Sequence, residues 1–307
     1  MLSATLNRAS RSARARKVVE SASLTRRVVD RFVAGEDASA AVAAARDLST
    51  AGKRFTIDLL GEDVVDVEGA RTIRSGYTAL LWELAEAGLA DGADVSLKLS
   101  ALGQGLPKVG RSLAAEHAQQ VCAAAQAVGA TVSLDMEDHT TVDSTLAIGN
   151  ELRREYPSLA TVLQSNLTRT PGDIAMLANS GARVRLVKGA YNEPASVAHQ
   201  RKADVDEAYC RDIAQLMAST CYPMIGTHDP RMIEEAAAAA RLYGRSTDAW
   251  ELQMLYGVRS DLQDQGVSAG RTMRIYIPYG SDWYGYFMRR LAERPANVAF
   301  FLRALTR

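Results

Sequence analysis

Eight short segments rich in β-branched and apolar residues recur along the chain, and each is followed by a stretch of helical character rich in Ala and Leu. Strands that alternate with helices in this way are typical of βα units, which build a parallel sheet. Eight such units in about 250 residues are what a closed (β/α)8 barrel requires. We therefore predict an α/β fold of the TIM-barrel type. The predicted strands are Arg54–Gly61, Asp94–Leu102, Thr131–Glu137, Thr161–Leu167, Arg183–Ala190, Tyr222–His228, Trp250–Tyr256 and Met273–Tyr279.

The segment before the first strand differs in composition from the barrel. Residues 1–50 are predicted to form an N-terminal extension of two or three helices, and residues 51–307 the barrel. From Met1 to Phe32 there are eight Lys and Arg side chains but two acidic ones. This composition favours a basic helix on the exterior of the fold. An organelle transit peptide and a segment that contacts a membrane surface are the alternative interpretations.

The bulk composition excludes several classes of protein. Apolar residues make up 47% of the chain, enough for a large core, and Lys plus Arg equal Asp plus Glu at 36 each. A balanced charge gives no reason to expect nucleic acid as a partner. Three cysteines without CxxC spacing argue against a disulfide framework and fit a reducing compartment. The four histidines lack HxH or HExxH spacing, so no metal is expected.

Polar and charged residues gather near the carboxyl ends of the predicted strands. In a barrel these ends converge on one face, where active sites are built. Helix capping would call for Ser, Asp or Asn rather than Lys, Arg and Gln, so the pattern favours a functional site. The residues are Asp58, Glu62, Lys98, Asp135, Glu137, Gln164, Asn166, Arg185, Lys188, Thr227, His228, Asp229, Glu251, Gln253, Tyr276 and Tyr279.

Lys98 stands in an apolar strand, where an ammonium group is costly unless it is paired or binds an anion. It can be a Schiff-base nucleophile, as in a barrel aldolase or lyase, or a fixed charge for a substrate carboxylate. Lys188 has the same two interpretations. Asp135 is the natural counter-charge, and strand alternation would place Asp135 and Glu137 on the same side, as an acid–base pair or as metal ligands.

Two adjacent arginines, Arg289 and Arg290, lie in a predicted helix after the last strand. Paired guanidinium groups match a carboxylate or phosphate, although two arginines on an exposed helix face are an equal alternative from this stretch alone. The aromatic residues that precede them favour a half-buried helix. Because no GxGxxG follows a strand and no GxSxG occurs, a Rossmann nucleotide site and a nucleophile elbow are not expected.

Several blocks resemble one family closely. The stretch from Tyr276 to Asn297, which contains YFMRRLAERPAN, resembles the signature of proline dehydrogenases. The segments TIDLLGE, SLKLSALG, SLDMED, RLVKGAYNEP, GTHDP and ELQMLYGV resemble other blocks of that family in the same order. RLVKGAY and the C-terminal stretch are the specific ones. Together the blocks span residues 54–298, and the chain length suggests the monofunctional bacterial type.

The resemblance implies a distorted (β/α)8 barrel with non-covalent FAD at the carboxyl ends of its strands and a C-terminal helix over that face. It implies oxidation of L-proline to Δ1-pyrroline-5-carboxylate, the first step of proline catabolism, by hydride transfer from proline C5 to flavin N5. Electrons would pass to a membrane quinone. A cytoplasmic enzyme peripheral to the inner face of the cell membrane is expected, with a separate downstream pyrroline-5-carboxylate dehydrogenase.

The resemblance also implies roles for residues on the substrate side. Arg289, Arg290 and Lys98 match the cations that clamp the proline carboxylate, and Glu62 matches a glutamate that pairs with the first clamp arginine and gates the site. Tyr276 matches a tyrosine that packs against the substrate ring. Asp135 matches the family's catalytic aspartate.

On the flavin side, Arg185 matches an arginine beside flavin N5. The other positions that match flavin contacts are Met136, Gln164, Val187, Lys188, Gly189, Thr227 and His228. The chain departs from the family pattern at Ser165 and Asn166, where Ala and Tyr are usual. Gly226 and Asp229 are milder departures, and neither pair removes a residue with an implied role.

Overall fold

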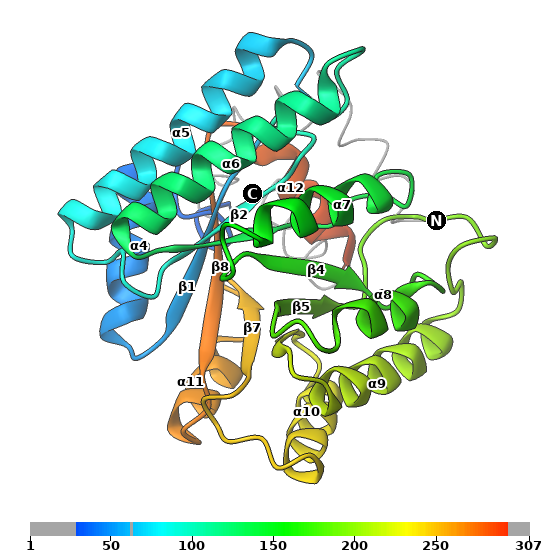
Figure 1. The fold of residues 1–307 in the computed structure, drawn as a ribbon. Helices are drawn as coiled ribbons and strands as arrows, with labels where there is room; N and C mark the ends of the chain where they lie inside the picture. Colours follow the sequence, from blue (N-terminus) through cyan, green and yellow to red (C-terminus); the bar gives the residue numbers. More distant parts are fainter. Residues whose placement is uncertain (1–28, 62–63, 294–307) are drawn as a thin grey trace, which may run out of the picture.

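The fold is described by a computed structural model that covers residues 29–61 and 64–293, with side chains as far as Met288 in the last helix (Figure 1). Most of the basic N-terminal segment, and Glu62, therefore lie outside the described residues. Of the two or three helices predicted before the barrel, the described part contains α4 (Ala38–Thr50), which runs directly into the first strand.

Eight parallel strands close into a barrel in chain order. The first and last strands pair over six residues, from Arg54 opposite Arg274 to Leu59 opposite Tyr279, so the sheet has no open edge. This closure confirms the predicted (β/α)8 barrel. The strands are β1 (Arg54–Leu59), β2 (Asp94–Leu97), β3 (Thr131–Leu134), β4 (Ala160–Gln164), β5 (Arg183–Val187), β6 (Tyr222–Gly226), β7 (Glu251–Leu255) and β8 (Met273–Tyr279).

Each strand is followed by a helix that packs an apolar stripe against the sheet. In α5, for example, Tyr77, Leu80, Leu81 and Leu84 are buried at the spacing of one helix face, and Asp66 caps the start by accepting the Gly69 N–H at 2.7 Å. The helices after α4 are α5 (Val67–Glu86), α6 (Gly110–Val128), α7 (Val142–Arg153), α8 (Thr170–Leu177), α9 (Lys202–Ala218), α10 (Pro230–Leu242), α11 (Ser260–Ser268) and α12 (Trp283–Glu293).

The predicted strands begin within a residue of the observed ones, but seven of the eight were predicted to run further at the carboxyl end. At these ends the chain leaves the hydrogen-bonded sheet, although the sequence still has the composition of a strand. Lys98, Asp135 and Lys188 all follow the last residue of their strands. Glu251 was wrongly predicted to lie at a carboxyl end, because it opens β7 and pairs with Arg274 within the barrel, at 2.7 Å.

The interior of the barrel is polar. Barrels of this type usually fill their interior with branched apolar side chains, whereas here buried hydroxyl, carboxylate and guanidinium groups occupy it. The apolar core lies instead between the strands and the helices, in two clusters that include Ile57, Val95 and Leu134 on one side and Val184, Ile225 and Ile275 on the other. The buried polar residues include Thr56, Asp94, Ser96, Ser133, Arg185, Gln253 and Arg274.

The last described helix packs against the first described segment. Trp283 and Phe287 of α12 lie in one buried cluster with Val29, Phe32 and Val33. The backbone reinforces this contact, because the Ala34 N–H donates to the carbonyl of Pro278 at 2.9 Å. A helix after strand eight is thereby fixed at the carboxyl end of the barrel, and its aromatic side chains are buried, as a half-buried helix requires.

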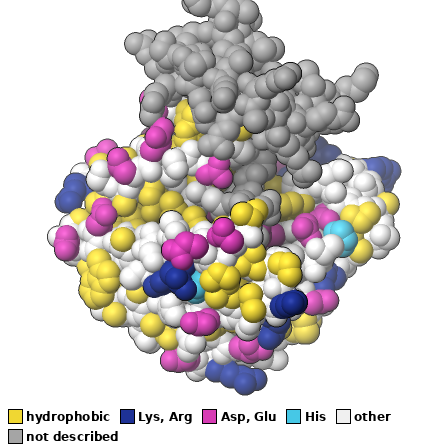
Figure 2. All heavy atoms as spheres, turned by 90° about the horizontal axis from the view of Figure 1, so that it is seen from above, with side chains coloured by type: hydrophobic (Ala, Val, Ile, Leu, Met, Phe, Trp, Pro, Cys, Tyr) yellow, Lys and Arg dark blue, Asp and Glu magenta, His cyan; other side chains and the backbone are white. Residues whose placement is uncertain are grey.

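The surface is mixed in character. Figure 2 shows acidic and basic side chains interspersed among neutral and hydrophobic ones on the described part of this face. Among the described residues, no helix has both the length and the apolar character needed to cross a membrane.

The hydroxyl of Tyr77 joins α5 to the first two strands. It donates to the carbonyl of Ser96 at 2.6 Å, accepts the Leu59 N–H at 3.1 Å, and lies 3.3 Å from an Asp58 oxygen. We predict that Tyr77→Phe lowers the free energy of unfolding by about 1–3 kcal/mol, because it leaves buried backbone groups unpaired. Urea denaturation measures the change.

Tyr156→Phe is the matched control. Tyr156 is also buried, but its hydroxyl contacts the exposed carboxylate of Glu155 at 3.2 Å. Its removal should change the free energy of unfolding by less than about 0.5 kcal/mol. Equal losses in the two variants would contradict the role given to Tyr77.

Candidate active site

A cavity of about 700 Å³ opens at the carboxyl ends of the strands. This volume is in the range of sites that bind small molecules and cofactors. Tyr286 of α12 also lines it, so the last helix forms part of its wall. Every residue that has a described side chain and a role implied by the resemblance lines this cavity: Lys98, Asp135, Met136, Gln164, Arg185, Val187, Lys188, Gly189, Thr227, His228 and Tyr276. Glu137, Asn166, Glu251 and Tyr279, which were grouped with them as polar residues near strand ends, do not line it.

Lys98 is held by carboxylates at the floor of the cavity. Its ammonium group donates to both oxygens of Asp58 at 2.8 Å and lies 3.4 Å from Asp135 Oδ2. The Tyr276 hydroxyl donates to the same Asp135 oxygen at 2.7 Å and lies 3.4 Å from the ammonium nitrogen. Two carboxylates therefore hold this half-buried ammonium group in place.

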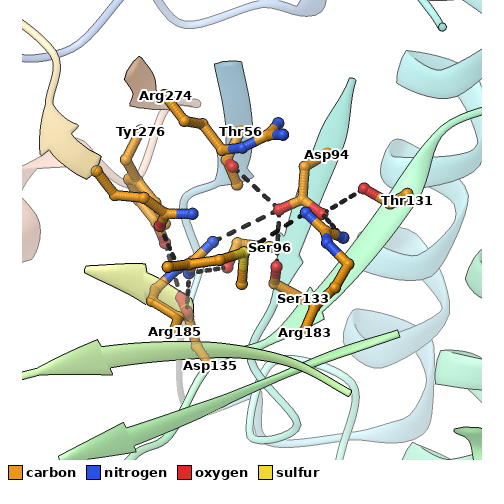
Figure 3. A network of polar contacts seen from close by, with 12 residues as sticks. Thr56, Asp94, Ser96, Thr131, Ser133, Asp135, Arg183, Arg185, Arg274 and Tyr276 are labelled. Carbon is orange, nitrogen blue, oxygen red and sulfur yellow. Dashed lines mark hydrogen bonds and ion pairs between the residues drawn. The ribbon is translucent and has the colours of Figure 1, made fainter. Parts of the chain in front are cut away.

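Arg185 is the second cation at the floor, and its side chain is almost completely buried. Nη1 donates to Asp135 Oδ1 at 2.7 Å and to Ser96 at 3.0 Å, while Nε donates to Gln253 at 2.6 Å. The Tyr276 ring lies beneath the guanidinium carbon, 5.4 Å from its centroid. Asp135 therefore connects Arg185, Tyr276 and Lys98 (Figure 3 shows the first two contacts).

The two carboxylates near Lys98 differ in their pKa. Burial alone would raise the pKa of Asp135, but the charges of Lys98 and Arg185 hold it below its usual value. Burial raises the pKa of Asp58 despite the opposing charge of Lys98. The pKa of Tyr276 lies well above its usual value because of burial and the adjacent carboxylates. Asp135 thus keeps its charge more readily than Asp58, and Tyr276 keeps its proton.

The wall formed by β5 needs glycine. Gly189 has φ of +102°, and a Cβ there would lie 2.1 Å from Asn166 Oδ1, so no other side chain fits without displacement. Beside it, Lys188 pairs with Asp206 at 2.6 Å and lies 3.3 Å from Asp229. The backbone and the paired Lys188 side chain are therefore held in place at this wall.

The wall formed by β4, β6 and β7 is ordered by backbone contacts. His228 Nε2 accepts the Leu255 N–H at 2.8 Å, which leaves the proton of a neutral ring on Nδ1. Gln164 donates to the carbonyl of Glu137 at 2.8 Å. Both side chains are thus held in place by the backbone.

The family model described as proline dehydrogenase matches residues 41–303 of the chain. The chain belongs to the proline dehydrogenase family. A relative named proline dehydrogenase from Deinococcus radiodurans is 41% identical over 280 residues, which covers 91% of this chain and 90% of that protein. Proline dehydrogenase 2 of Bacillus subtilis is 39% identical, with 90% of each chain covered. As predicted, the chain resembles monofunctional bacterial proline dehydrogenases.

Larger proteins share the fold. The bifunctional protein PutA of Escherichia coli is 27% identical, and the match covers 89% of this chain but 24% of PutA. The crystal structure of proline utilization A from Bdellovibrio bacteriovorus, inactivated by N-propargylglycine, matches with a TM-score of 0.82 at 24% identity. The chain spans 33% of that solved structure, which supports the barrel fold alone.

Three predicted residues of the proline dehydrogenase site are not placed. Glu62 lies outside the described residues, and the side chains of Arg289 and Arg290 lie outside the described part of α12. The helix that carries both arginines is described, and its Tyr286 lines the cavity.

The predicted pairing of Asp135 with Glu137 is wrong. β3 ends at Leu134, and the two carboxylates point to different partners. Glu137 accepts from the backbone N–H of Ser100 at 3.0 Å and from its hydroxyl at 2.5 Å, so it anchors the loop after β2. Asp135 alone of the two lines the cavity.

Sequence reasoning missed the partners beneath the site. Asp58 and Gln253 were noted as polar residues near strand ends but received no role, and Asp94 and Ser96 were not noted. A signal was present, because Asp94, Ser96 and Lys98 alternate in one segment and must face the same side of the strand. An inward-facing lysine predicts that the two polar residues before it also face the interior.

Stability should depend on the ionisation of Asp135. A carboxyl whose pKa is depressed on folding stabilises the protein above its unfolded pKa of about 3.9, and the benefit is lost as the pH falls through the folded pKa. We predict that Asp135→Asn lowers the free energy of unfolding by about 3 kcal/mol at pH 7. The deficit should shrink below about pH 4, as urea titrations between pH 7 and pH 3 would measure.

Asp143→Asn provides the control, because Asp143 is 86% exposed and pairs with Arg169 at the surface. It should cost less than about 0.5 kcal/mol. A deficit for Asp135→Asn that stays constant down to pH 3 would show that the loss does not come from its charge.

Proposed function

We propose that this chain oxidises L-proline to Δ1-pyrroline-5-carboxylate, the first step of proline catabolism, with non-covalently bound FAD. Membership of the proline dehydrogenase family supports the reaction. The observation that carries the proposal is the convergence of eleven residues, implied by the resemblance to contact substrate or flavin, on one cavity. They come from six of the eight strands or the loops that follow them.

The cavity fits a flavin in its size and chemistry. Met136, Val187 and Met254 give it apolar walls, as a flat ring requires, and Lys188 offers a charge for an anionic tail. We propose that Gln164, Arg185, Lys188, Thr227 and His228 hold the group, together with Met136, Val187 and Gly189. When bound, FAD supplies a hydride acceptor, which side chains cannot provide.

The described floor of the cavity is already balanced in charge. Lys98 and Arg185 face Asp58 and Asp135, so a substrate carboxylate needs further positive charge. We propose that Arg289 and Arg290 supply it from α12, and that Lys98 completes the clamp. Three cations around one small anion fix its orientation, which contributes to rate by removing rotational freedom before the reaction.

We propose that Tyr276 packs against the substrate ring while Asp135 holds its hydroxyl. The contact at 2.7 Å fixes the plane of the tyrosine ring. Arg185 presents a positive charge to the cavity from below, where it favours negative charge that develops on the acceptor. Glu62 is proposed to pair with Arg289 as a gate.

A Schiff-base mechanism is less well supported by the geometry. An amine nucleophile must be neutral, whereas Lys98 contacts Asp58 with both carboxylate oxygens at 2.8 Å and Lys188 contacts Asp206 at 2.6 Å. Borohydride reduction in the presence of a carbonyl substrate should therefore leave the protein unmodified.

The fate of the electrons and of the product is proposed to be that of monofunctional bacterial proline dehydrogenases. Electrons are proposed to leave to a quinone, which requires contact with the inner face of the cell membrane by a cytoplasmic protein. The pyrroline-5-carboxylate formed would then pass to a separate dehydrogenase. Liposome sedimentation with quinone-loaded vesicles tests the membrane contact.

Anaerobic addition of L-proline to the purified protein tests the proposed function directly. The protein should be yellow, and its visible absorption should bleach as proline is oxidised. D-proline is the control, because a site that orients C5 by clamping the carboxylate distinguishes the two hands. A flavin-loaded sample that keeps its colour with L-proline would rule out the substrate.

Arg289→Met tests the clamp. The loss of one charged partner from a buried site costs about 2–5 kcal/mol, so the KM for proline should rise at least about 30-fold with flavin still bound. Arg111→Met is the matched control, because Arg111 is 54% exposed and pairs with Glu151 on the outer helices. A KM that stays within about twofold in Arg289→Met would contradict the assignment.

A further inference from the structure

Beneath the cavity lies a carboxylate that the proposed mechanism does not use. Asp94 is the first residue of β2, is fully buried, and points into the barrel (Figure 3). Hydroxyl groups on both neighbouring strands donate to it: Thr56 at 3.0 Å, Thr131 at 2.7 Å and Ser133 at 2.7 Å. A carboxylate with three hydroxyl donors is fixed in orientation.

Guanidinium groups complete its surroundings. Arg183 approaches Oδ1 at 3.3 Å and Arg185 approaches Oδ2 at 3.5 Å. Burial alone would raise the pKa of Asp94, but the charges of Arg183, Arg274 and Arg185 hold it well below its usual range. Asp94 is therefore a permanent negative charge inside the barrel.

The two oxygens of Asp94 face different parts of the molecule. Oδ1 contacts Thr131 and Arg183, whose side chain reaches the carbonyl of Ser158 away from the cavity. Oδ2 contacts Arg185, whose side chain lines the cavity. Asp94 thus connects a structural part of the barrel to the floor of the site.

Arg185 is held from three directions. Asp94 contacts Nη2, Gln253 accepts from Nε, and Asp135 accepts from Nη1. Gln253 is itself fixed, because its amide donates to Glu251 at 2.6 Å and Glu251 pairs with Arg274. The plane of the guanidinium is set by carboxylates on β2 and at the end of β3 and by the Gln253 amide on β7.

Such an arrangement is a poor way to stabilise a barrel. Buried ion pairs often stabilise no better than well-packed apolar side chains of the same volume, which barrels of this type commonly use. A carboxylate beneath Arg185 can instead fix the orientation of its guanidinium group. That group must keep one orientation in order to contact Asp135 and line the cavity at the same time. We infer that Asp94 is a positioning residue, which holds the Arg185 guanidinium in the plane that the reaction requires.

The kinetic consequence of this inference rests on the proposed function, and Asp94→Asn tests it. Asparagine keeps the shape of the side chain and removes its charge. The kcat for L-proline should fall about 10- to 100-fold, the effect of a displaced active-site group. The KM should change less than about threefold and flavin should remain bound, because Asp94 does not line the cavity.

Thr131→Val is the matched control. It removes a hydrogen bond from the same carboxylate, but on the oxygen that faces away from Arg185. Its kcat should stay within about twofold of the wild type. An equal loss of kcat in both variants would show that disruption of the barrel, rather than the contact with Arg185, lowers the rate, and would overturn the inference.

A double-mutant cycle with Arg185→Met separates positioning from a general structural role. If Asp94 acts through Arg185, adding Asp94→Asn to Arg185→Met should lower kcat less than about twofold further. Effects that multiply would mean that Asp94 acts independently of Arg185, which overturns the inference.

Two measurements decide the contact without any activity. The losses in Tm of the single variants should not add in the double variant, and a crystal structure of Asp94→Asn should show the Arg185 guanidinium displaced from Gln253 or Asp135. Additive losses with Arg185 in place would overturn the inference. If the wild type fails to oxidise proline, the proposed function falls, while these measurements still decide the role of Asp94.

Discussion

The ion pair between Arg185 and Asp135 is the interaction on which the candidate site depends. Its 2.7 Å contact joins β5 to the end of β3, and the second oxygen of Asp135 reaches Tyr276 on β8. One carboxylate thereby sets the positions of side chains from distant parts of the sequence. This is possible because closing the sheet brings the ends of all eight strands around one axis.

The buried charges are arranged as nearly closed pairs: Lys98 with Asp58, Arg185 with Asp135, and Arg274 with Glu251. A barrel that contained these cations without partners would lose several kcal/mol for each one. Pairing them offsets the cost of burying each charge, and it also leaves no unpaired positive charge on the described floor of the cavity. Because the described floor is neutral, the positive charge proposed for an anionic substrate has to come from outside the barrel wall.

The fold and many of the residues that line the cavity could be predicted from the sequence, but the pairings could not. Alternation of strands and helices predicts the barrel, and the strand starts were predicted within one residue. The strand ends were not, because apolar residues such as Leu99 and Met136 continue past the ladder in the sequence. Lys98 was expected to pair with Asp135, whereas its nearer partner is Asp58. Which carboxylate lies nearer to Lys98 depends on the register between β1 and β2, and the spacing of residues in the sequence does not determine that register.

The contact between α12 and the segment around Phe32 has a consequence for the order of events during synthesis. The cluster that fixes α12 joins the first described residues to the last, and β1 pairs with β8. A growing chain therefore carries β1 as an exposed edge, with Phe32 and Val33 uncovered, until the final strand and helix have left the ribosome. Tyr286 completes the cavity wall at the same moment. The nascent chain is therefore most open to misassociation just before the barrel closes and the wall of the cavity is completed.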